Sequence, residues 1–484
     1  MIPLLALAAH PAPRHPNILF VLADDLGYRE LGCYGNTFDE TPRIDGFAKK
    51  SLRFTSAYAM PVCSPTRSSL MTGKYPVRTG INTFLNPGSP VFLDPAKEYA
   101  LPRLLSDAGY HTTLIGKWHL DSRYRRQVGT PRAHGFQETI ATETKGIGDG
   151  DYVFPYDKIA TITDGKPDEF LVDRMNEEAV GVLRRAAQTP DKPFFLYLAH
   201  YAVHTVLDAP PDTVAKYERK YAAKHGEAAL ARFRLDPRHE GHPDNPVLAA
   251  MLEHIDTGFG RLLDTLHELK MDGNTVVVFL SDNGGERKVA DNAPLREGKA
   301  TLYEGGLRVP QIVYVPGVTR PGTTDAPTFT ADYYPTFAGM AGAALPKDQP
   351  IDGLSFLPIL KSQTPASRTL FWHFAGIAGT ASQPGAGDAM REGDLKLVNE
   401  YRTGKYEMFD VKADPSERHD LAAAQPARLA ALRARLDAWR KARGIVVPPT
   451  GGGAKPVDDG LTVEGPGSSR SAPLKPGASA PGPR

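Results

Sequence analysis

The chain has 484 residues, and 57 Lys and Arg residues almost balance 56 Asp and Glu residues. A chain of this length can bury a substantial core, so we expect one large domain with a smaller one attached. The balanced charge provides no overall field to attract a nucleic acid backbone or an anionic membrane. No stretch approaches the roughly 20 apolar residues of a membrane-spanning helix, so we expect no membrane span.

The two ends of the chain differ in composition from the rest. Residues 1–14 contain a short apolar run and an Ala-Leu-Ala pattern before a Pro-rich junction, which is typical of the end of a signal peptide. No Lys or Arg precedes this run, so a frayed terminus is the alternative. We favour export and expect a periplasmic or secreted protein. Residues 447–484 are rich in Pro, Gly and Ser, which predicts a disordered tail.

Short apolar runs then alternate with amphipathic segments, which is typical of βα units that build a mostly parallel sheet. We predict strands at residues 17–23, 112–115, 194–199, 275–280 and 311–315. Apolar residues recur every three and four positions in four segments, which predicts helices at residues 99–108, 169–187, 247–269 and 331–341.

The pattern changes near residue 369. Short alternating runs predict antiparallel strands at residues 370–374, 395–399 and 405–411, and an amphipathic helix is predicted at 428–443. We therefore expect a large α/β domain at residues 15–365 and a smaller α+β subdomain at residues 366–446.

Polar side chains follow four of the predicted strands, at the point where each strand ends. These residues are Asp24 and Asp25, Lys117 and His119, His200 and His204, and Asp282 and Asn283. Each could be a helix cap, a turn or a structural histidine if it stood alone. In an open α/β sheet, however, ligands bind beyond the carboxyl ends of the strands, so the repetition predicts one common site.

The acidic members of this set predict a metal site. Asp24, Asp25, Asp282 and Asn283 offer only oxygen ligands, which favours calcium, with magnesium or manganese as weaker candidates. His200 and His204 have a spacing that suits zinc, but the glutamate of a metalloprotease motif is missing. We therefore reject a zinc site.

Cys63 opens the segment Cys-Ser-Pro-Thr-Arg-Ser-Ser-Leu-Met-Thr-Gly. Pro65 suits a first helical turn and Gly73 suits a helix end, so Cys63 is predicted at a helix N-terminus, where an anion is favoured. The alternatives are a buried free cysteine or a disulfide with Cys33, the only other cysteine. The residues alone leave these alternatives open.

The chain resembles the type I, formylglycine-dependent sulfatases of the alkaline-phosphatase superfamily, and in particular the arylsulfatase-A-like enzymes of bacteria. The resemblance rests on residues 16–27, 109–120, 279–285 and 295–306, and on the Cys-x-Pro-x-Arg element at 63–67 followed by Thr72 and Gly73. It implies a large, mainly parallel sheet sandwiched by helices, with a smaller antiparallel sheet plus helix at the C-terminus. It also implies that a formylglycine-generating enzyme oxidises Cys63, which argues against the disulfide.

The resemblance further implies a role for each site residue. Calcium would be bound by Asp24, Asp25, Asp282, Asn283 and the modified Cys63. The hydrated aldehyde at position 63, hydrogen-bonded by Arg67, would attack sulfur, and its second hydroxyl, with His119 as base, would expel sulfate. Lys117 and Lys299 would neutralise the sulfate oxygens, and His204 would assist the departing alcohol.

The substrate is less determined by the sequence. Asp121 and Glu297 add negative charge near the anion site, and we expect them to affect substrate choice. Trp372, His373 and residues 391–396 are candidates for the pocket wall, and His373 is our candidate for substrate binding, although core packing is equally plausible. We expect a sulfated carbohydrate, such as a galactose or N-acetylgalactosamine unit. The alternatives are a phosphonate or phosphate monoester hydrolase of the same superfamily, or a non-catalytic binder of sulfated glycans with an unmodified Cys63.

Overall fold

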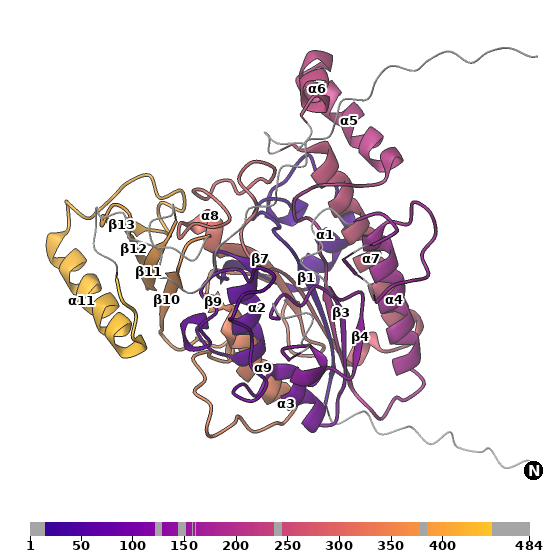
Figure 1. The fold of residues 1–484 in the computed structure, drawn as a ribbon, viewed down its shortest axis with the longest axis horizontal. Coiled ribbons are helices and arrows are strands. Elements are labelled where there is room, and N and C mark those ends of the chain that lie inside the picture. The colour runs from indigo at the N-terminus through magenta and orange to yellow at the C-terminus, as the bar shows by residue number, and fades with distance from the viewer. Residues whose placement is uncertain are drawn as a thin grey trace, which may run out of the picture. The chain divides into compact units, whose positions relative to one another are not determined.

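The structure is a computed structural model that describes residues 15–121, 128–143, 152–156, 158–159, 161–236, 244–377 and 385–447. These residues form a large helix-flanked sheet and a separate four-stranded sheet (Figure 1). The predicted signal-peptide remnant at 1–14 and the predicted tail beyond residue 447 lie outside the described residues. No helix in the described part of the chain has the length and apolar character needed to cross a membrane.

The large sheet has the strand order β4-β3-β5-β1-β6-β7-β2-β8, and β9 pairs with β2. Its strands are β1 (Asn17–Ala23), β2 (Leu52–Tyr58), β3 (His111–Gly116), β4 (Glu138–Ile140), β5 (Phe194–Ala199), β6 (Thr275–Ser281), β7 (Arg308–Tyr314), β8 (Gly322–Thr324) and β9 (Thr328–Phe329). Strand β1 lies between β5 and β6 and is parallel to both, whereas β7 is antiparallel to β6 and β2. Every residue of β1, β5 and β6 is buried, as expected for continuous apolar runs in a sheet covered on both faces.

Helices cover both faces of this sheet. The helices of the large domain are α1 (Pro42–Ala48), α2 (Cys63–Thr72), α3 (Leu101–Asp107), α4 (Leu171–Ala186), α5 (Pro211–His225), α6 (Glu227–Arg234), α7 (Pro246–Glu268), α8 (Glu304–Leu307), α9 (Tyr333–Met340) and α10 (Leu357–Leu360). Helix α5 packs on α7, and α6 packs on α5. Short 3-10 turns occur at Gly32–Tyr34, Pro76–Arg78, Arg132–His134, Asp272–Asn274 and Thr330–Asp332. Alternate residues of β1 belong to two separate cores, because Leu19 and Val21 pack with α1, α4 and α7, whereas Phe20 and Leu22 pack with α2, α3 and α9.

The smaller sheet is an antiparallel meander of β10 (Thr369–Phe374), β11 (Gly387–Glu392), β12 (Leu395–Glu400) and β13 (Tyr406–Asp410), followed by α11 (Pro426–Arg443). Its two faces have different neighbours. Trp372 packs against Tyr58 of β2 with ring centroids 5.3 Å apart, whereas Phe371 stacks on Trp439 of α11 at 4.9 Å. One face therefore contacts the large domain and the other contacts α11.

The predicted strands and helices are confirmed, with ends shifted by up to three residues. The main difference is that β2, β4, β8, β9 and β11, and helices α1, α5, α6, α8 and α10, were not predicted from the sequence. These elements are short or carry mixed polar and apolar residues, so their local pattern is weak.

Candidate active site

Most of the predicted site residues lie at the carboxyl edge of the large sheet. Because β1 lies between the parallel strands β5 and β6, the ends of these strands meet at one edge. Asp24 and Asp25 follow β1, Asp282 and Asn283 follow β6, and Cys63 begins α2. The confirmed strands thus bring together residues that lie more than 200 positions apart in the chain.

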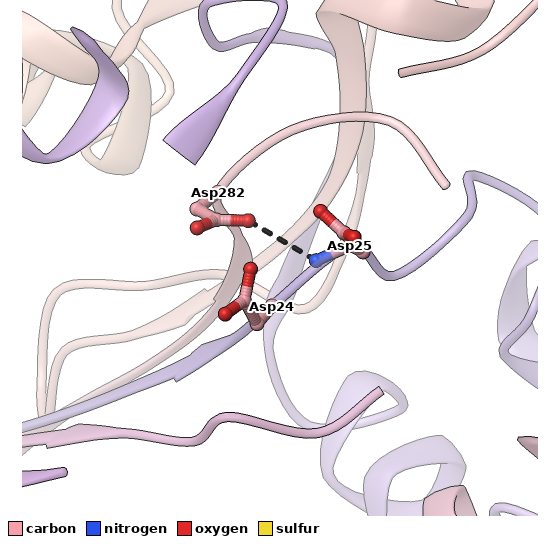
Figure 2. Close-up of side chains that lie close together, drawn as sticks. All are labelled: Asp24, Asp25 and Asp282. Carbon is pink, nitrogen blue, oxygen red and sulfur yellow. Dashed lines mark hydrogen bonds between the residues drawn. The ribbon is translucent and has the colours of Figure 1, made fainter. Parts of the chain in front are cut away.

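Three carboxylates converge at this edge. Asp24, Asp25 and Asp282 are 0%, 1% and 0% exposed, and each offers a ligand oxygen within 4.8 Å of the others. Figure 2 shows the three side chains gathered around one point, with the Asp25 amide donating to Asp282 Oδ1 at 3.1 Å. Asp25 adopts a left-handed backbone conformation, with φ of 60°, which turns its side chain out of the strand direction. Among the described residues, this is the group of acidic, histidine and cysteine side chains that could hold a metal ion.

Three cations balance these carboxylates. Lys117 Nζ contacts Asp24 Oδ2, and Lys299 Nζ lies 2.6 Å from Asp25 Oδ2. Arg67 Nε and Nη2 donate to Asp282 Oδ2 at 3.1 and 2.7 Å. Burial raises the pKa of Asp282 to about 6. The negative charge of Asp24 raises this pKa further, and the positive charge of Arg67 opposes the shift. Burial also acts on Asp25, but the charges of Lys299, His204 and Lys117 outweigh it and hold the pKa of Asp25 below its usual range.

Two oxygens in the cluster remain available as ligands. Asn283 Nδ2 donates to Asp25 Oδ1 at 2.7 Å and to Gly284 O at 2.9 Å, which leaves Asn283 Oδ1 as an acceptor. Asn283 Oδ1 and Asp24 Oδ1 are buried and have no hydrogen-bond partner among the described residues. Buried polar atoms in native proteins are rarely left without a partner. An all-oxygen set with two such atoms fits a hard divalent cation.

Cys63 lies beside this cluster at the first residue of α2 and is 2% exposed. Its Sγ is 3.1 Å from His119 Nδ1, and His119 Nε2 is 2.9 Å from Leu85 O. Burial and the Lys117 charge hold the pKa of His119 well below its usual value, so the ring is neutral. With Nε2–H donating to Leu85 O, the Nδ1 lone pair faces position 63. Burial raises the pKa of the Cys63 thiol to about 11. Both cysteines are free, which excludes the disulfide with Cys33 in this structure.

Glu143 supports this arrangement and was not predicted. Its carboxylate accepts hydrogen bonds from the Trp118 amide at 2.9 Å, from the His119 amide and from the Tyr201 hydroxyl at 3.1 Å. His119 has a positive φ of 53°, so these bonds fix an unusual backbone turn under the imidazole. No sequence motif marks Glu143, because its partners become neighbours only in the folded chain.

The two histidines after β5 are placed differently. His204 Nε2 lies 3.7 Å from Asp25 Oδ2, and burial together with the Lys299 charge lowers the pKa of His204 to about 4. His200 is 1% exposed and is not part of the metal-ligand group, and burial alone lowers its pKa to about 3. The structure therefore brings His204 to the site and leaves His200 in the core.

The prediction that His373 lines the substrate pocket is not supported by its position. His373 Nδ1 lies 2.7 Å from Asp388 Oδ1, and Arg440 of α11 donates to the other Asp388 oxygen at 2.6 Å. The ring therefore lies on the face of the small sheet that contacts α11, away from the large domain. The reason is the alternation of side chains along β10, which turns Trp372 toward the large domain and its neighbour His373 toward α11.

The other C-terminal candidates are structural. Trp372 is 0% exposed, and its Nε1 donates to Ala59 O at 2.9 Å. Arg391 donates to the Tyr58 hydroxyl at 2.5 Å. Lys396 is buried between Glu304 and Glu417, with its Nζ 2.9 Å from each carboxylate. The contacts of Trp372 and Arg391 join the small sheet to the segment at the end of β2.

Comparisons with known proteins agree with this geometry. Residues 16–343 match the family model for sulfatases, and residues 298–441 match the model for the C-terminal part of N-sulphoglucosamine sulphohydrolase. The chain is 30% identical to a sulfatase of Formosa agariphila over 86% of each chain. It is 31% identical to the N-acetylgalactosamine-6-sulfatase of Canis lupus familiaris, over 76% of this chain and 70% of that one.

A solved structure shows the same architecture. It is that of Ps i-CgsB in complex with k-i-k-neocarrahexaose, which superposes with a TM-score of 0.75 at 29% identity and covers 88% of this chain and 92% of that chain. The mostly parallel helix-flanked sheet with its separate antiparallel sheet is the alkaline-phosphatase fold of the sulfatases. The chain belongs to the sulfatase family, whose members hydrolyse sulfate esters.

Proposed function

We propose that this chain hydrolyses sulfate esters of sulfated carbohydrates, with a formylglycine derived from Cys63 as the nucleophile and with a bound calcium ion. The observation that carries the proposal is the position of Cys63. Its sulfur is 3.1 Å from a neutral His119, and the charges of Lys117, Asp24, Lys299 and Asp282 all act on it.

The oxygens of Asp24, Asp25, Asp282 and Asn283 would hold the calcium ion. Two observations support calcium: the carboxylates of the site lie close together, and two buried acceptor oxygens have no hydrogen-bond partner among the described residues. When bound, the ion would offset negative charge and act as a Lewis acid for the sulfate group and the hydroxyl at position 63.

The lysines of the site would bind the sulfate group. Lys117 contacts the carboxylate of Asp24, and Lys299 contacts that of Asp25. A divalent cation on the same carboxylates would compensate their charge, so both ammonium groups would become available to the sulfate oxygens. Arg67 would remain on Asp282, where two hydrogen bonds and a third to Lys117 O at 2.7 Å fix its guanidinium.

The histidines would move protons at two different atoms. The formylglycine aldehyde, once hydrated, supplies one hydroxyl to attack sulfur and a second to expel sulfate. His119 Nδ1 faces position 63 and would take the proton of that second hydroxyl. His204 Nε2 lies at the edge of the cluster, where it would hydrogen-bond the leaving oxygen of the substrate alcohol.

The relatives support a carbohydrate substrate. One is named as an N-acetylgalactosamine-6-sulfatase, and the similar solved structure contains a neocarrahexaose. We therefore propose a sulfated galactose or N-acetylgalactosamine unit. The Cys-x-Pro-x-Arg element supports maturation by a formylglycine-generating enzyme, and the apolar first residues support export.

Substitution of Cys63 tests the proposal. We expect Cys63→Ala to abolish sulfate release without loss of the fold, because the change is small. Cys63→Ser should stall after one turnover or show none, because its sulfate ester lacks the second hydroxyl. Cys33→Ser is the matched control and should retain activity. Mass spectrometry of the peptide that contains residue 63 should show the aldehyde in protein from the natural host.

Three outcomes would overturn the proposal. Sustained turnover by Cys63→Ser, or faster turnover of aryl phosphonate and phosphate esters than of an aryl sulfate, would favour the phosphonate or phosphate hydrolase. An unmodified thiol at position 63 in protein from the natural host, with binding but no turnover of sulfated glycans, would favour the non-catalytic binder.

A further inference from the structure

Ser64, the residue after Cys63, accepts a hydrogen bond from the backbone of a distant loop. The Leu85 amide donates to Ser64 Oγ at 3.0 Å, although 21 positions separate the two residues in the chain. Both residues are buried, so solvent does not compete for this bond. Because a buried amide that loses its acceptor is costly, the bond holds the Leu85 peptide in place.

The carbonyl of the same residue contacts the histidine that we propose as the base. Leu85 O lies 2.9 Å from His119 Nε2, and a carbonyl oxygen can only accept, so Nε2 carries the hydrogen. The neutral ring then has its lone pair at Nδ1, which lies 3.1 Å from Cys63 Sγ. The Leu85 carbonyl therefore decides which nitrogen of His119 can accept a proton at position 63.

These contacts close a ring of four residues, which are Cys63, Ser64, Leu85 and His119. Cys63 and Ser64 are neighbours in the first turn of α2, so the nucleophile precursor and the acceptor of the Leu85 amide share one helix. Leu85, in contrast, belongs to residues 79–100, a described stretch without helix or strand. The position of its peptide therefore depends on individual contacts, and the bond to Ser64 is the contact made by its amide.

The same loop has another attachment, which does not involve the Leu85 peptide. Thr83 Oγ1 donates to Gly376 O at 2.8 Å, and Gly376 follows β10 of the small sheet. Removal of the Ser64 hydroxyl would leave this attachment intact. The change would therefore act on the Leu85 peptide and on its contact with the imidazole.

We propose that Ser64 is a positioning residue for the release of sulfate from residue 63, because it holds the carbonyl that sets the tautomer of His119. The inference rests on the proposed function. In this step His119 Nδ1 takes the proton of the remaining hydroxyl, the aldehyde C=O forms, and the carbon–oxygen bond to sulfate breaks, so that sulfate leaves with the electron pair. Without the Ser64 bond, the Leu85 peptide can turn, and the ring can carry its hydrogen on Nδ1, where it cannot accept.

The kinetics of Ser64→Ala on an aryl sulfate test this inference, with rates normalised to the fraction of residue 63 that mass spectrometry shows as the aldehyde. We expect kcat to fall by about tenfold or more. Since attack on sulfur precedes the affected step, KM should fall in parallel, and kcat/KM should stay within about twofold. A burst of aryl alcohol, equal in amount to the enzyme, should precede the slow steady state. Ser64→Thr keeps the hydroxyl and should restore kcat.

Hydrogen exchange provides a readout that does not depend on turnover. In the protein with an unmodified Cys63, the Leu85 amide should exchange slowly, and Ser64→Ala should accelerate its exchange by about tenfold or more. Thr336→Val is the matched control, because Thr336 Oγ1 in α9 also accepts from a buried amide, that of Phe356, at 3.0 Å. This variant should leave kcat, KM and the exchange of the Leu85 amide unchanged.

Three results would overturn the inference. The first is a fall of kcat in Ser64→Ala at constant KM and without a burst, which is the pattern of a smaller fraction of folded enzyme. The second is an exchange rate of the Leu85 amide that Ser64→Ala does not change. The third is fast exchange of this amide in the unsubstituted protein. Absence of turnover of every sulfate ester by the matured, unsubstituted enzyme would instead count against the proposed function.

Discussion

Substitution of Lys396 tests whether this part of the small sheet stabilises the fold or binds substrate. Its ammonium group lies 2.9 Å from Glu304 Oε1 and from Glu417 Oε1, and all three side chains are 0% exposed. Glu304 has further partners in the Tyr58 hydroxyl at 2.8 Å and in Arg308 at 3.3 Å. Glu417 also accepts a backbone hydrogen bond from the Glu304 amide at 2.7 Å. The group left with the least compensation after removal of Lys396 is therefore Glu417.

We expect Lys396→Met to lower the free energy of unfolding by about 3–5 kcal/mol, because it leaves a buried carboxylate without its cation. Burial already raises the pKa of Glu417 to about 7 even with Lys396 present. Adding Glu417→Gln to Lys396→Met removes the uncompensated charge and should recover about 1–3 kcal/mol. Urea unfolding followed by tryptophan fluorescence, with calorimetry as a second probe, measures both changes.

The control is Lys412→Met, which removes an exposed lysine paired with Asp325 at 3.2 Å. It should change stability by less than about 0.5 kcal/mol. If Lys396→Met costs less than about 1 kcal/mol and instead raises KM for a sulfated glycan, the buried triad does not stabilise the fold and Lys396 contacts substrate.

Three further predictions concern the metal, the acidic core and the turn at His119. Chelation of calcium, from a starting concentration of a hundred times Kd, should lower the free energy of unfolding by about 2.7 kcal/mol and lower the thermal midpoint with it. Lys117, Lys299 and Arg67 balance the carboxylates, so the loss should follow this binding linkage, and equal stabilisation by magnesium would contradict calcium selectivity. Burial raises the pKa of Asp39 from 3.8 to about 7, so the folded state keeps a proton that the unfolded state loses. The free energy of unfolding should therefore fall as the pH rises from about 4 to about 7. Asp39→Asn should make the free energy of unfolding less dependent on pH, as measured by urea titrations at several pH values. Glu143→Gln should lower kcat for sulfate release by about tenfold or more with little change in the thermal midpoint, because it loosens the His119 turn; an unchanged kcat would argue against this positioning role.

Much of the site followed from the sequence because its signals are local. The apolar runs at β1, β5 and β6 are long enough to predict strands that are buried on both faces. Parallel strands end at one edge, so the polar residues after them had to meet, as Asp24, Asp25 and Asp282 do. The helix that begins at Cys63 followed in the same way from a proline in its first turn and a glycine at its end, where Gly73 has φ of 69°.

Other features depended on partners that are distant in sequence. Strand β2 carries mixed residues and is defined by its antiparallel pairing with β7 and by β8 and β9 on its other side. His373 could have faced either side of its strand, and the packing of α11 decided which. Lys396 looked like a surface lysine until the fold placed two glutamates around it.

The sequence by itself determined the central strands of the large sheet, their functional edge and the residue types gathered there. The reason is that the apolar pattern of a strand or helix and the end of a strand are properties of neighbouring residues. Only the tertiary structure decided which charges are paired. Three contacts join different segments or opposite ends of a loop. They are those of Lys117 with Asp24, of Glu143 with the His119 amide, and of Arg287 with Glu297. Electrostatic and hydrogen-bond energies depend on distance and burial, which the order of residues along the chain does not contain.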